Sequence, residues 1–350
     1  MKIAAAGVAL PEHYYPQSVL TDYLCQLWGK RPELVRRLTS LHENVQVEGR
    51  HLAYPLERYA ELDTFGRNND AWIVAATELG EKAVRQALER AGLEPTDVDA
   101  IYFSTVTGLA SPSIDALLVN RMGLRPDVKR NPLFGLGCVA GAAALSRAAD
   151  YVRAYPHGVA VVLTVELCSL TFQREDLTVA NLISAGLFGD GAGAAVVVGA
   201  GRSGGRGPRI VDTRSVFYPD TEDVMGWSVS ERGFRIVLSP AVPAVARENA
   251  GRDVDAFLAD HGLTRSQIGS WVCHPGGPKV LGAVRDALGL QDEDLALSWE
   301  SLRRVGNLSS ASALLILEAM IERRHPASGT RGLMLAMGPG FCSELLLLEW

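Results

Sequence analysis

Residues 133–141, Leu133-Phe134-Gly135-Leu136-Gly137-Cys138-Val139-Ala140-Gly141, form an apolar, glycine-rich turn before a run of small residues that continues to Ala149. We predict that this run is a helix and that Cys138 lies at its N-terminus. The helix dipole lowers the pKa of a cysteine there and favours the thiolate, which is the nucleophilic form. The turn therefore predicts a reactive thiol, although an isolated cysteine is more often a buried structural residue.

The second half of the chain repeats this pattern. Gly306-Asn307 precedes a predicted helix through Leu314 and Leu317, as Gly137-Cys138 precedes the first one. The duplication places Cys138 and Asn307 on equivalent helix starts.

Other pairs of segments keep the same order in both halves. Gly92 and Gly262 each end a predicted helix before an apolar strand, and glycine is the usual residue at that position. The apolar strands 159–165 and 332–337 follow the two small-residue helices, and continuous apolar runs suit strands covered by helices on both faces.

We therefore predict an α/β fold of two duplicated halves, residues 1–205 and 206–350. The boundary falls in the glycine-rich segment 199–208. Chance similarity between two α/β segments is the alternative.

Composition limits the possible functions. The chain has 350 residues, a formal net charge of −6 and scattered basic residues, which argues against nucleic-acid binding. The five cysteines contain no CxxC pair, so we expect a reducing cytoplasm and no metal site. No run of 18 apolar residues is present, and we interpret residues 3–10 as a buried strand rather than a signal peptide.

His274 follows the predicted strand 270–273, and strand ends beside helix N-termini are where open α/β sheets build their sites. We expect Cys138, His274 and Asn307 to converge there. The Cys138 thiolate would attack an acyl thioester, His274 as imidazolium would stabilise it, and Asn307 would donate to a developing negative charge. Such donors each lower a barrier by about 3–4 kcal/mol. Alone, His274 is equally well a packed core histidine and Asn307 an N-cap.

In these residues the chain resembles the type III polyketide synthases, the chalcone-synthase-like branch of the thiolase fold. The motifs that carry the resemblance occur in the family's order along the whole chain: Gly137-Cys138-Val139-Ala140-Gly141, Leu187-Phe188-Gly189-Asp190-Gly191-Ala192-Gly193, His274-Pro275-Gly276-Gly277-Pro278, Gly306-Asn307-Leu308-Ser309-Ser310-Ala311 and Gly338-Pro339-Gly340. The resemblance implies a homodimer of αβαβα-layered subunits. It also implies acyl-CoA and malonyl-CoA as substrates, no other cofactor, and a cyclised resorcinol- or pyrone-type product.

The resemblance also assigns roles to residues. It makes Cys138 the nucleophile and acyl carrier, and it makes His274 and Asn307 the pair that holds the malonyl thioester and stabilises the enolate. Phe188 matches a gatekeeping aromatic residue, and Thr171 and Ser309 match small residues that line the cavity.

The sequence departs from the plant pattern in the segment 225–236 and at Ser111. In a loose alignment, Trp227 replaces a small cavity residue and Ile236 a second gatekeeping Phe, with Phe234 between them along the cavity. Ser111 replaces a Met that crosses the dimer interface. These changes resemble bacterial enzymes that make alkylresorcinols or alkylpyrones, so we expect an aliphatic starter.

Three other functions compete with this one. A β-ketoacyl synthase shares the fold and a Cys-His-Asn site, but its initiating branch has Gln-Ala-Asn after the histidine, where this chain has Pro275-Gly276-Gly277. A papain-type hydrolase and an inactive scaffold are the others; the duplication weighs against the first and the intact triad against the second. We also consider Arg50 and His51 as contacts for CoA phosphates, although a solvated surface pair is the simpler interpretation.

Overall fold

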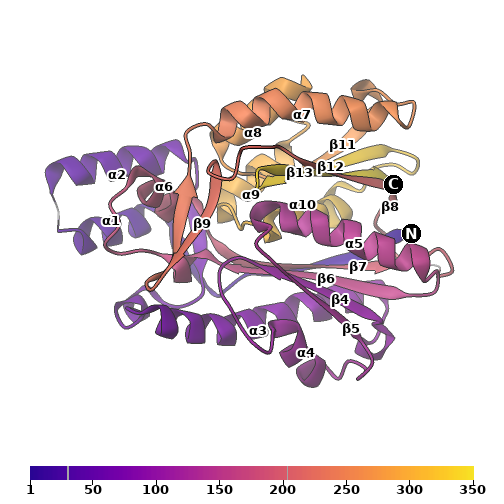
Figure 1. Cartoon of the computed structure of the whole chain (residues 1–350), viewed down its shortest axis with the longest axis horizontal. Coiled ribbons are helices and arrows are strands. Elements are labelled where there is room, and N and C mark those ends of the chain that lie inside the picture. The colour runs from indigo at the N-terminus through magenta and orange to yellow at the C-terminus, as the bar shows by residue number, and fades with distance from the viewer. Residues whose placement is uncertain (30, 203) are drawn as a thin grey trace.

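The computed structural model describes residues 1–29, 31–202 and 204–350. Ser203, inside the predicted boundary segment, lies outside the described residues. The helices and strands run in five layers, with the outer helices α7 and α8 on one side and α3 and α4 on the other (Figure 1). Between them lie two sheet layers that enclose the central helices α5 and α10 (Figure 1). The prediction of an αβαβα arrangement is confirmed.

The two halves share one strand order. The nine-stranded sheet runs β11-β12-β13-β8-β1-β7-β6-β4-β5, so β4-β6-β7-β1 of the first half matches β11-β12-β13-β8 of the second. Pairing directions match as well: the first pair of each set is parallel and the next two are antiparallel. A single pair, Lys2 with Arg209, joins the two sets.

The equivalent elements have these bounds. In the first half they are β1 (Lys2–Ala9), α3 (Phe65–Ala91), β4 (Ala100–Thr105), α5 (Ala140–Ala154), β6 (Val159–Leu167) and β7 (Asp190–Val198). In the second half they are β8 (Arg209–Phe217), α7 (Val242–Ala259), β11 (Ile268–Cys273), α10 (Ala311–Ala319), β12 (Arg331–Gly338) and β13 (Cys342–Glu349). β1 confirms that the N-terminal residues form a buried strand.

The remaining elements surround this repeat. The first half adds β2 (His13–Pro16), α1 (Gln17–Leu27), α2 (Pro32–Asn44), β3 (Gly49–Leu52), α4 (Ile114–Met122), β5 (Lys129–Phe134) and α6 (Val179–Leu187). The second half adds the hairpin β9 (Met225–Ser230) and β10 (Gly233–Leu238), and the helices α8 (Pro278–Leu288) and α9 (Ala296–Val305).

The glycine turns after α3 and α7 are built alike. Gly92 and Gly262 have φ angles of 66° and 64°, the left-handed conformation that glycine adopts without steric cost. After each glycine, the amide of Leu93 or Leu263 donates to a carbonyl five residues earlier, at 3.0 Å in both turns. This repeated hydrogen bond supports the duplication at the level of the backbone.

Small residues allow the central layer to pack closely. α5 is rich in alanine, and its apolar face packs with α10 and both sheets into one buried cluster. A Cβ atom at Gly141 would collide with the Ser310 carbonyl oxygen, so glycine lets the starts of α5 and α10 touch. The beginnings of these two helices, one from each half, therefore meet at the centre of the molecule. None of the helices in the described part of the chain is long and apolar enough to cross a membrane.

Candidate active site

Cys138 lies in a 3₁₀ turn, residues 137–139, that leads directly into α5. Its side chain is buried, with 6% of the residue exposed. Gly137 has a φ of 56°, and a Cβ atom there would lie 2.6 Å from Cδ of Pro339. The connection between β12 and β13 therefore presses on the turn and holds Cys138 in place.

Asn307 does not begin a helix, contrary to the expectation from the duplication. α10 begins at Ala311, and Asn307 lies in an extended segment that forms a parallel bridge with Phe188. Its amide donates to Leu187 O at 2.9 Å, and its carbonyl accepts from the Gly189 amide at 3.0 Å. The backbone of Asn307 is thus fixed by the end of α6 rather than by a helix cap.

Ser309 is the residue that occupies the position equivalent to Cys138, because each lies two residues before its central helix. The Cys138 thiol donates to Ser309 Oγ at 3.6 Å, and the Ser309 amide donates to Asn307 Oδ1 at 2.8 Å. Ser309 also has a φ of 47°, a left-handed conformation that is uncommon for non-glycine residues. Cys138, Ser309 and Asn307 therefore form one connected group.

His274 follows β11 immediately, as predicted, and its amide donates to Leu335 O of β12 at 2.9 Å. The imidazole is buried, and neither ring nitrogen has a hydrogen-bond partner within the described part of the chain. Burying a polar ring without hydrogen-bond partners destabilises the folded state. Folded proteins rarely contain such a group, and a catalytic or ligand-binding role is one explanation for it. The structure thus leaves both nitrogens of His274 free for substrate.

Burial acts against the charged forms of both residues. It raises the pKa of Cys138 to about 12; hydrogen bonds from Ser309 and Asn307 lower this pKa, and the charge of Glu166 raises it. Burial lowers the pKa of His274 to about 3. The thiolate beside an imidazolium that we expected from the sequence therefore has burial against it, and it stays a prediction.

Glu166, which the sequence analysis missed, is a fully buried carboxyl group at the end of β6. It accepts hydrogen bonds from the Val106 amide at 3.1 Å and from Thr107 Oγ1 at 2.9 Å, and it also accepts one from Ser310 at the start of α10. Burial raises the pKa of Glu166 to about 7. The available signal was an acidic residue inside a strand whose other residues are almost all apolar.

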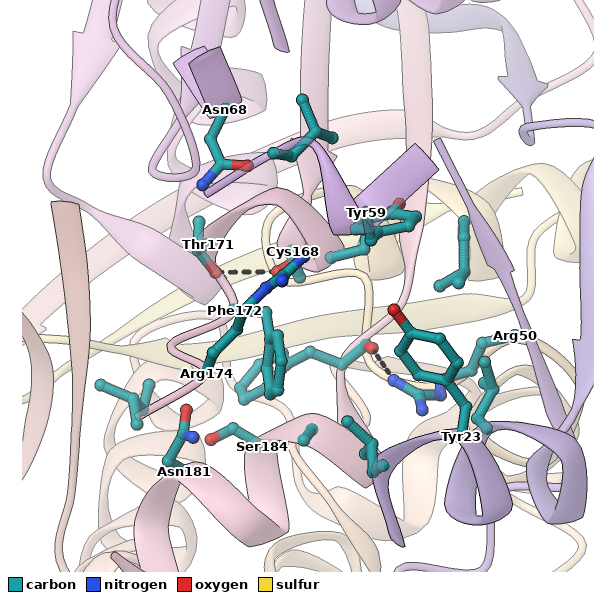
Figure 2. A pocket seen from close by; sticks show the side chains of 18 of the residues that line it. Tyr23, Arg50, Tyr59, Asn68, Cys168, Thr171, Phe172, Arg174, Asn181 and Ser184 are labelled. Atoms are coloured by element: carbon teal, nitrogen blue, oxygen red, sulfur yellow. Dashed lines mark hydrogen bonds between the residues drawn. The ribbon is translucent and has the colours of Figure 1, made fainter. Parts of the chain in front are cut away.

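A cavity of about 900 Å³, including its opening to solvent, lies between α1, α6 and the β9–β10 hairpin. Cys138, His274 and Asn307 are not among the described residues that line it; Phe188, which lines it, connects it to Asn307 through their backbone bridge. Figure 2 shows its polar residues, among them Arg50, Cys168 and Thr171. Five predicted residues line it: Thr171, Phe188, Trp227, Phe234 and Ile236. Sequence reasoning missed the wall formed by α1, which contributes Leu20, Tyr23, Leu24 and Leu27.

Two predicted lining residues lie elsewhere. Ser309 is buried against Cys138 and is not part of the wall of this cavity. Ser111 lies exposed on the loop between β4 and α4, where no other part of this chain covers it. Its position on the outer surface agrees with a role at a subunit contact, which stays a prediction.

Arg50 is not a solvated surface residue, and that interpretation was wrong. Only 5% of the residue is exposed, and its guanidinium lines the cavity wall. Its Nη1 donates to Phe188 O at 2.6 Å, and its Nε donates to Gln17 Oε1 at 3.2 Å. His51, by contrast, is half-buried and its Nδ1 lies 2.6 Å from Pro11 O.

Known proteins resemble this chain in sequence and in fold over nearly their full length. The family model for the N-terminal domain of chalcone and stilbene synthases matches residues 1–202, and the model for the C-terminal domain matches residues 209–349. A 1,3,6,8-tetrahydroxynaphthalene synthase from Streptomyces peucetius subsp. caesius is 51% identical, over 99% of this chain and 93% of that protein. A putative chalcone synthase from Bacillus subtilis (strain 168) is 37% identical, over 99% of this chain and 98% of that protein.

Among solved structures, the 1,3,6,8-tetrahydroxynaphthalene synthase of Streptomyces coelicolor A3(2), a bacterial type III polyketide synthase, superposes with a TM-score of 0.95. It is 32% identical and covers 100% of this chain and 99% of that one. These matches support polyketide synthesis and not the β-ketoacyl synthase alternative. The chain belongs to the chalcone and stilbene synthase family and is a type III polyketide synthase, an acyltransferase that condenses CoA thioesters with decarboxylation of malonyl-CoA.

Proposed function

We propose that this enzyme makes 1,3,6,8-tetrahydroxynaphthalene and that malonyl-CoA supplies every carbon of the product. The observation that carries the proposal is the 51% identity, over nearly the whole of both chains, to a protein of that activity. The ten carbons of a naphthalene ring system correspond to five two-carbon units, so no larger starter is needed. The proposal replaces the aliphatic starter expected from Trp227 and Ile236 alone.

We assign the acyl-carrying step to Cys138. Its sulfur attacks the thioester carbonyl of the first CoA substrate, a new C–S bond forms, and CoA leaves as the thiol. Both ring nitrogens of His274 are free of other hydrogen bonds within the described residues, so the imidazole can take the thiol proton as the C–S bond forms and pass it to the departing CoA sulfur. Ser309 receives the thiol hydrogen bond at rest and orients the sulfur.

We assign decarboxylation to His274 and Asn307. The bond between the malonyl methylene and its carboxylate breaks, CO₂ leaves, and the electron pair becomes an enolate on the thioester oxygen. Donors fixed in advance toward that oxygen stabilise it because they need no reorganisation during the reaction. The enolate carbon then attacks the Cys138 thioester, forming a C–C bond and breaking the C–S bond.

A second candidate is an aliphatic starter, and one observation favours it. Leucines from α1 and from residues 52–62 give the cavity a long apolar wall: Leu20, Leu24, Leu27, Leu52, Leu56 and Leu62. Such a wall suits an alkyl chain as well as an aromatic intermediate.

We further propose a homodimer that works in the cytoplasm and needs no cofactor beyond its CoA thioester substrates. Exposed apolar side chains support a subunit contact near the site: Leu109, Phe134 and Phe217. Five free cysteines in the described chain suit a reducing compartment. Light scattering after gel filtration tests the dimer.

Product analysis separates the two candidates. The purified enzyme is incubated with malonyl-CoA alone, and then with malonyl-CoA plus acyl-CoA starters of increasing chain length, and the products are identified by mass spectrometry. We expect tetrahydroxynaphthalene from malonyl-CoA alone. Alkylated resorcinols or pyrones formed with long starters, and no aromatic product without them, would contradict the proposal.

A further inference from the structure

The segment Gly186-Leu187-Phe188-Gly189 ends α6 and borders both the cavity and Asn307. Asn307 uses its backbone donor on Leu187 O and its backbone acceptor on the Gly189 amide. The backbone N–H and the backbone carbonyl of Asn307 therefore both form their hydrogen bonds with this segment. A shift of residues 186–189 therefore moves Asn307 with it.

Two buried side chains hold the same segment from the opposite side. Arg50 donates from Nη1 to Phe188 O at 2.6 Å, and Gln17 donates from Nε2 to Gly186 O at 2.8 Å. Arg50 also donates from Nε to Gln17 Oε1 at 3.2 Å, so the two side chains support each other. Figure 2 shows the Arg50 guanidinium at the cavity wall.

The charge on Arg50 has a local partner. Asp190 follows Gly189, and its buried carboxylate accepts from the amides of Ser169 and Ala53 at 2.8 and 2.7 Å. Burial lowers the pKa of Arg50 to about 10, and the negative charge of Asp190 opposes this effect. The guanidinium therefore stays charged at neutral pH. Hydrogen bonds from a charged donor are about twice as strong as neutral ones, so Arg50 fixes Phe188 O firmly.

We propose that Arg50 is a positioning residue for decarboxylation: it holds residues 186–189 where their backbone fixes Asn307, and it does not touch the reacting atoms through that contact. The inference rests on the proposed role of Asn307. Lysine cannot replace Arg50, because its ammonium is a single point charge, whereas the guanidinium reaches Phe188 and Gln17 in two fixed directions.

The test measures two reactions of the same protein. Acetyl-CoA release from malonyl-CoA reports the step assigned to Asn307. The rate at which iodoacetamide alkylates the tryptic peptide 131–147 reports access to Cys138, because the other free cysteines lie in other peptides. We expect Arg50→Lys to lower kcat for decarboxylation about 10- to 100-fold, which is the cost of displacing a group near a reacting centre by about 1 Å. KM and the alkylation rate should stay close to the wild-type values.

A matched control is Arg265→Lys, because Arg265 also holds main-chain carbonyls, Ala287 O at 2.8 Å and Gly251 O at 3.0 Å, but away from the site. It should leave both reactions unchanged. Gln17→Leu removes the second contact and keeps the buried charge, so it should give a smaller loss in the same direction. This variant also serves if Arg50→Lys does not fold.

Asn307→Ala, measured beside these variants, separates the possible failures. If Asn307→Ala keeps decarboxylation, the proposed role of Asn307 is wrong. If Asn307→Ala loses it while Arg50→Lys and Gln17→Leu keep wild-type kcat, only the inference about Arg50 is wrong. A parallel loss of alkylation and decarboxylation in Arg50→Lys would show a general structural defect and would also overturn the inference.

Discussion

The two halves of the molecule share a strand order but differ in the connection after the third equivalent strand, β6 or β12. In the first half, residues 168–189 form a long connection that carries α6 and reaches the cavity through Thr171 and Phe188. In the second half, residues 339–341 make the same connection as a tight turn. The strand order is thus the same in both halves, whereas the cavity depends on the long connection that only the first half has.

Each connection has its own task. A Cβ atom at Gly338, the last residue of β12, would lie 2.8 Å from both Leu136 O and the Val139 amide, and one at Gly137 would lie 2.6 Å from Cδ of Pro339. The end of β12 and the short connection therefore pack directly on the turn that holds Cys138. The long connection holds the backbone of Asn307 through Leu187 and Gly189. Each half thus positions a proposed catalytic residue of the other half: the second half holds Cys138 and the first half holds Asn307.

The largest expected effect follows from removing the thiol of the first half. Cys138→Ala should abolish polyketide formation, because the acyl carrier is lost. It should keep release of acetyl-CoA from malonyl-CoA, because the donors of the second half remain. Mass spectrometry of the products checks both; loss of decarboxylation together with condensation would contradict the division of labour between the halves.

The second prediction concerns the amide side chain of Asn307, in the second half. Asn307→Ala should lower kcat for decarboxylation about 10²- to 10³-fold, the usual effect of removing one donor to a developing oxyanion. Its Cys138 should still be alkylated by iodoacetamide and form an acyl-enzyme with the starter. An Asn307 variant that decarboxylates at the wild-type rate would show that the amide has no part in this step.

A smaller effect concerns the contact between the halves. Gly141→Ala should lower the free energy of unfolding by about 1–3 kcal/mol, because its Cβ atom meets the Ser310 carbonyl at the start of α10 and the packed helices cannot separate freely.

The control for Gly141→Ala is Gly282→Ala in α8, where nothing lies within 4 Å of the added Cβ atom. This variant should be stabilised by up to about 1 kcal/mol, because alanine has the higher helix propensity. Urea unfolding measures both. Equal changes in the two variants would mean that the contact between α5 and α10 is not tight.

The smallest effect is the pH dependence contributed by His274. Its folded pKa of about 3 lies below the ordinary value of 6.5, so the folded state resists protonation. The unfolded chain binds this proton below pH 6.5, and the stabilising contribution is therefore lost as the pH falls from about 7 to 5. In His274→Gln, the loss of unfolding free energy over that range should be smaller by about 1–2 kcal/mol. Identical pH profiles would contradict the burial of a neutral ring.

The sequence predicted the features that depend on local pattern. The Gly92 and Gly262 turns, the buried strands and the position of His274 after a strand follow from hydrophobic runs and glycine placement, and the structure confirms them. The duplication predicted the wrong counterpart for Cys138, because equal spacing along the chain did not show that α10 begins only four positions after Asn307. Helix position gave no sign that Cys138 is buried, and burial raises its pKa rather than lowering it.

Long-range contacts explain the other misses. The burial of Arg50 depends on α6, more than 100 residues away in the chain, and the α1 wall of the cavity depends on how the first helices pack. Neither leaves a local signal in the sequence. Ser309 was assigned to the cavity, whereas its hydroxyl contacts the thiol of Cys138.

Trapping the acyl-enzyme tests the central claim most directly, because the described site holds two buried thiols, Cys138 and Cys168. The enzyme is mixed with the starter CoA thioester, quenched in acid and digested with trypsin, which places Cys138 in peptide 131–147 and Cys168 in peptide 154–174. Peptide mass spectrometry should find the acyl mass on peptide 131–147. An acyl group found only on peptide 154–174, or on neither peptide, would contradict the assignment of Cys138 as the acyl carrier.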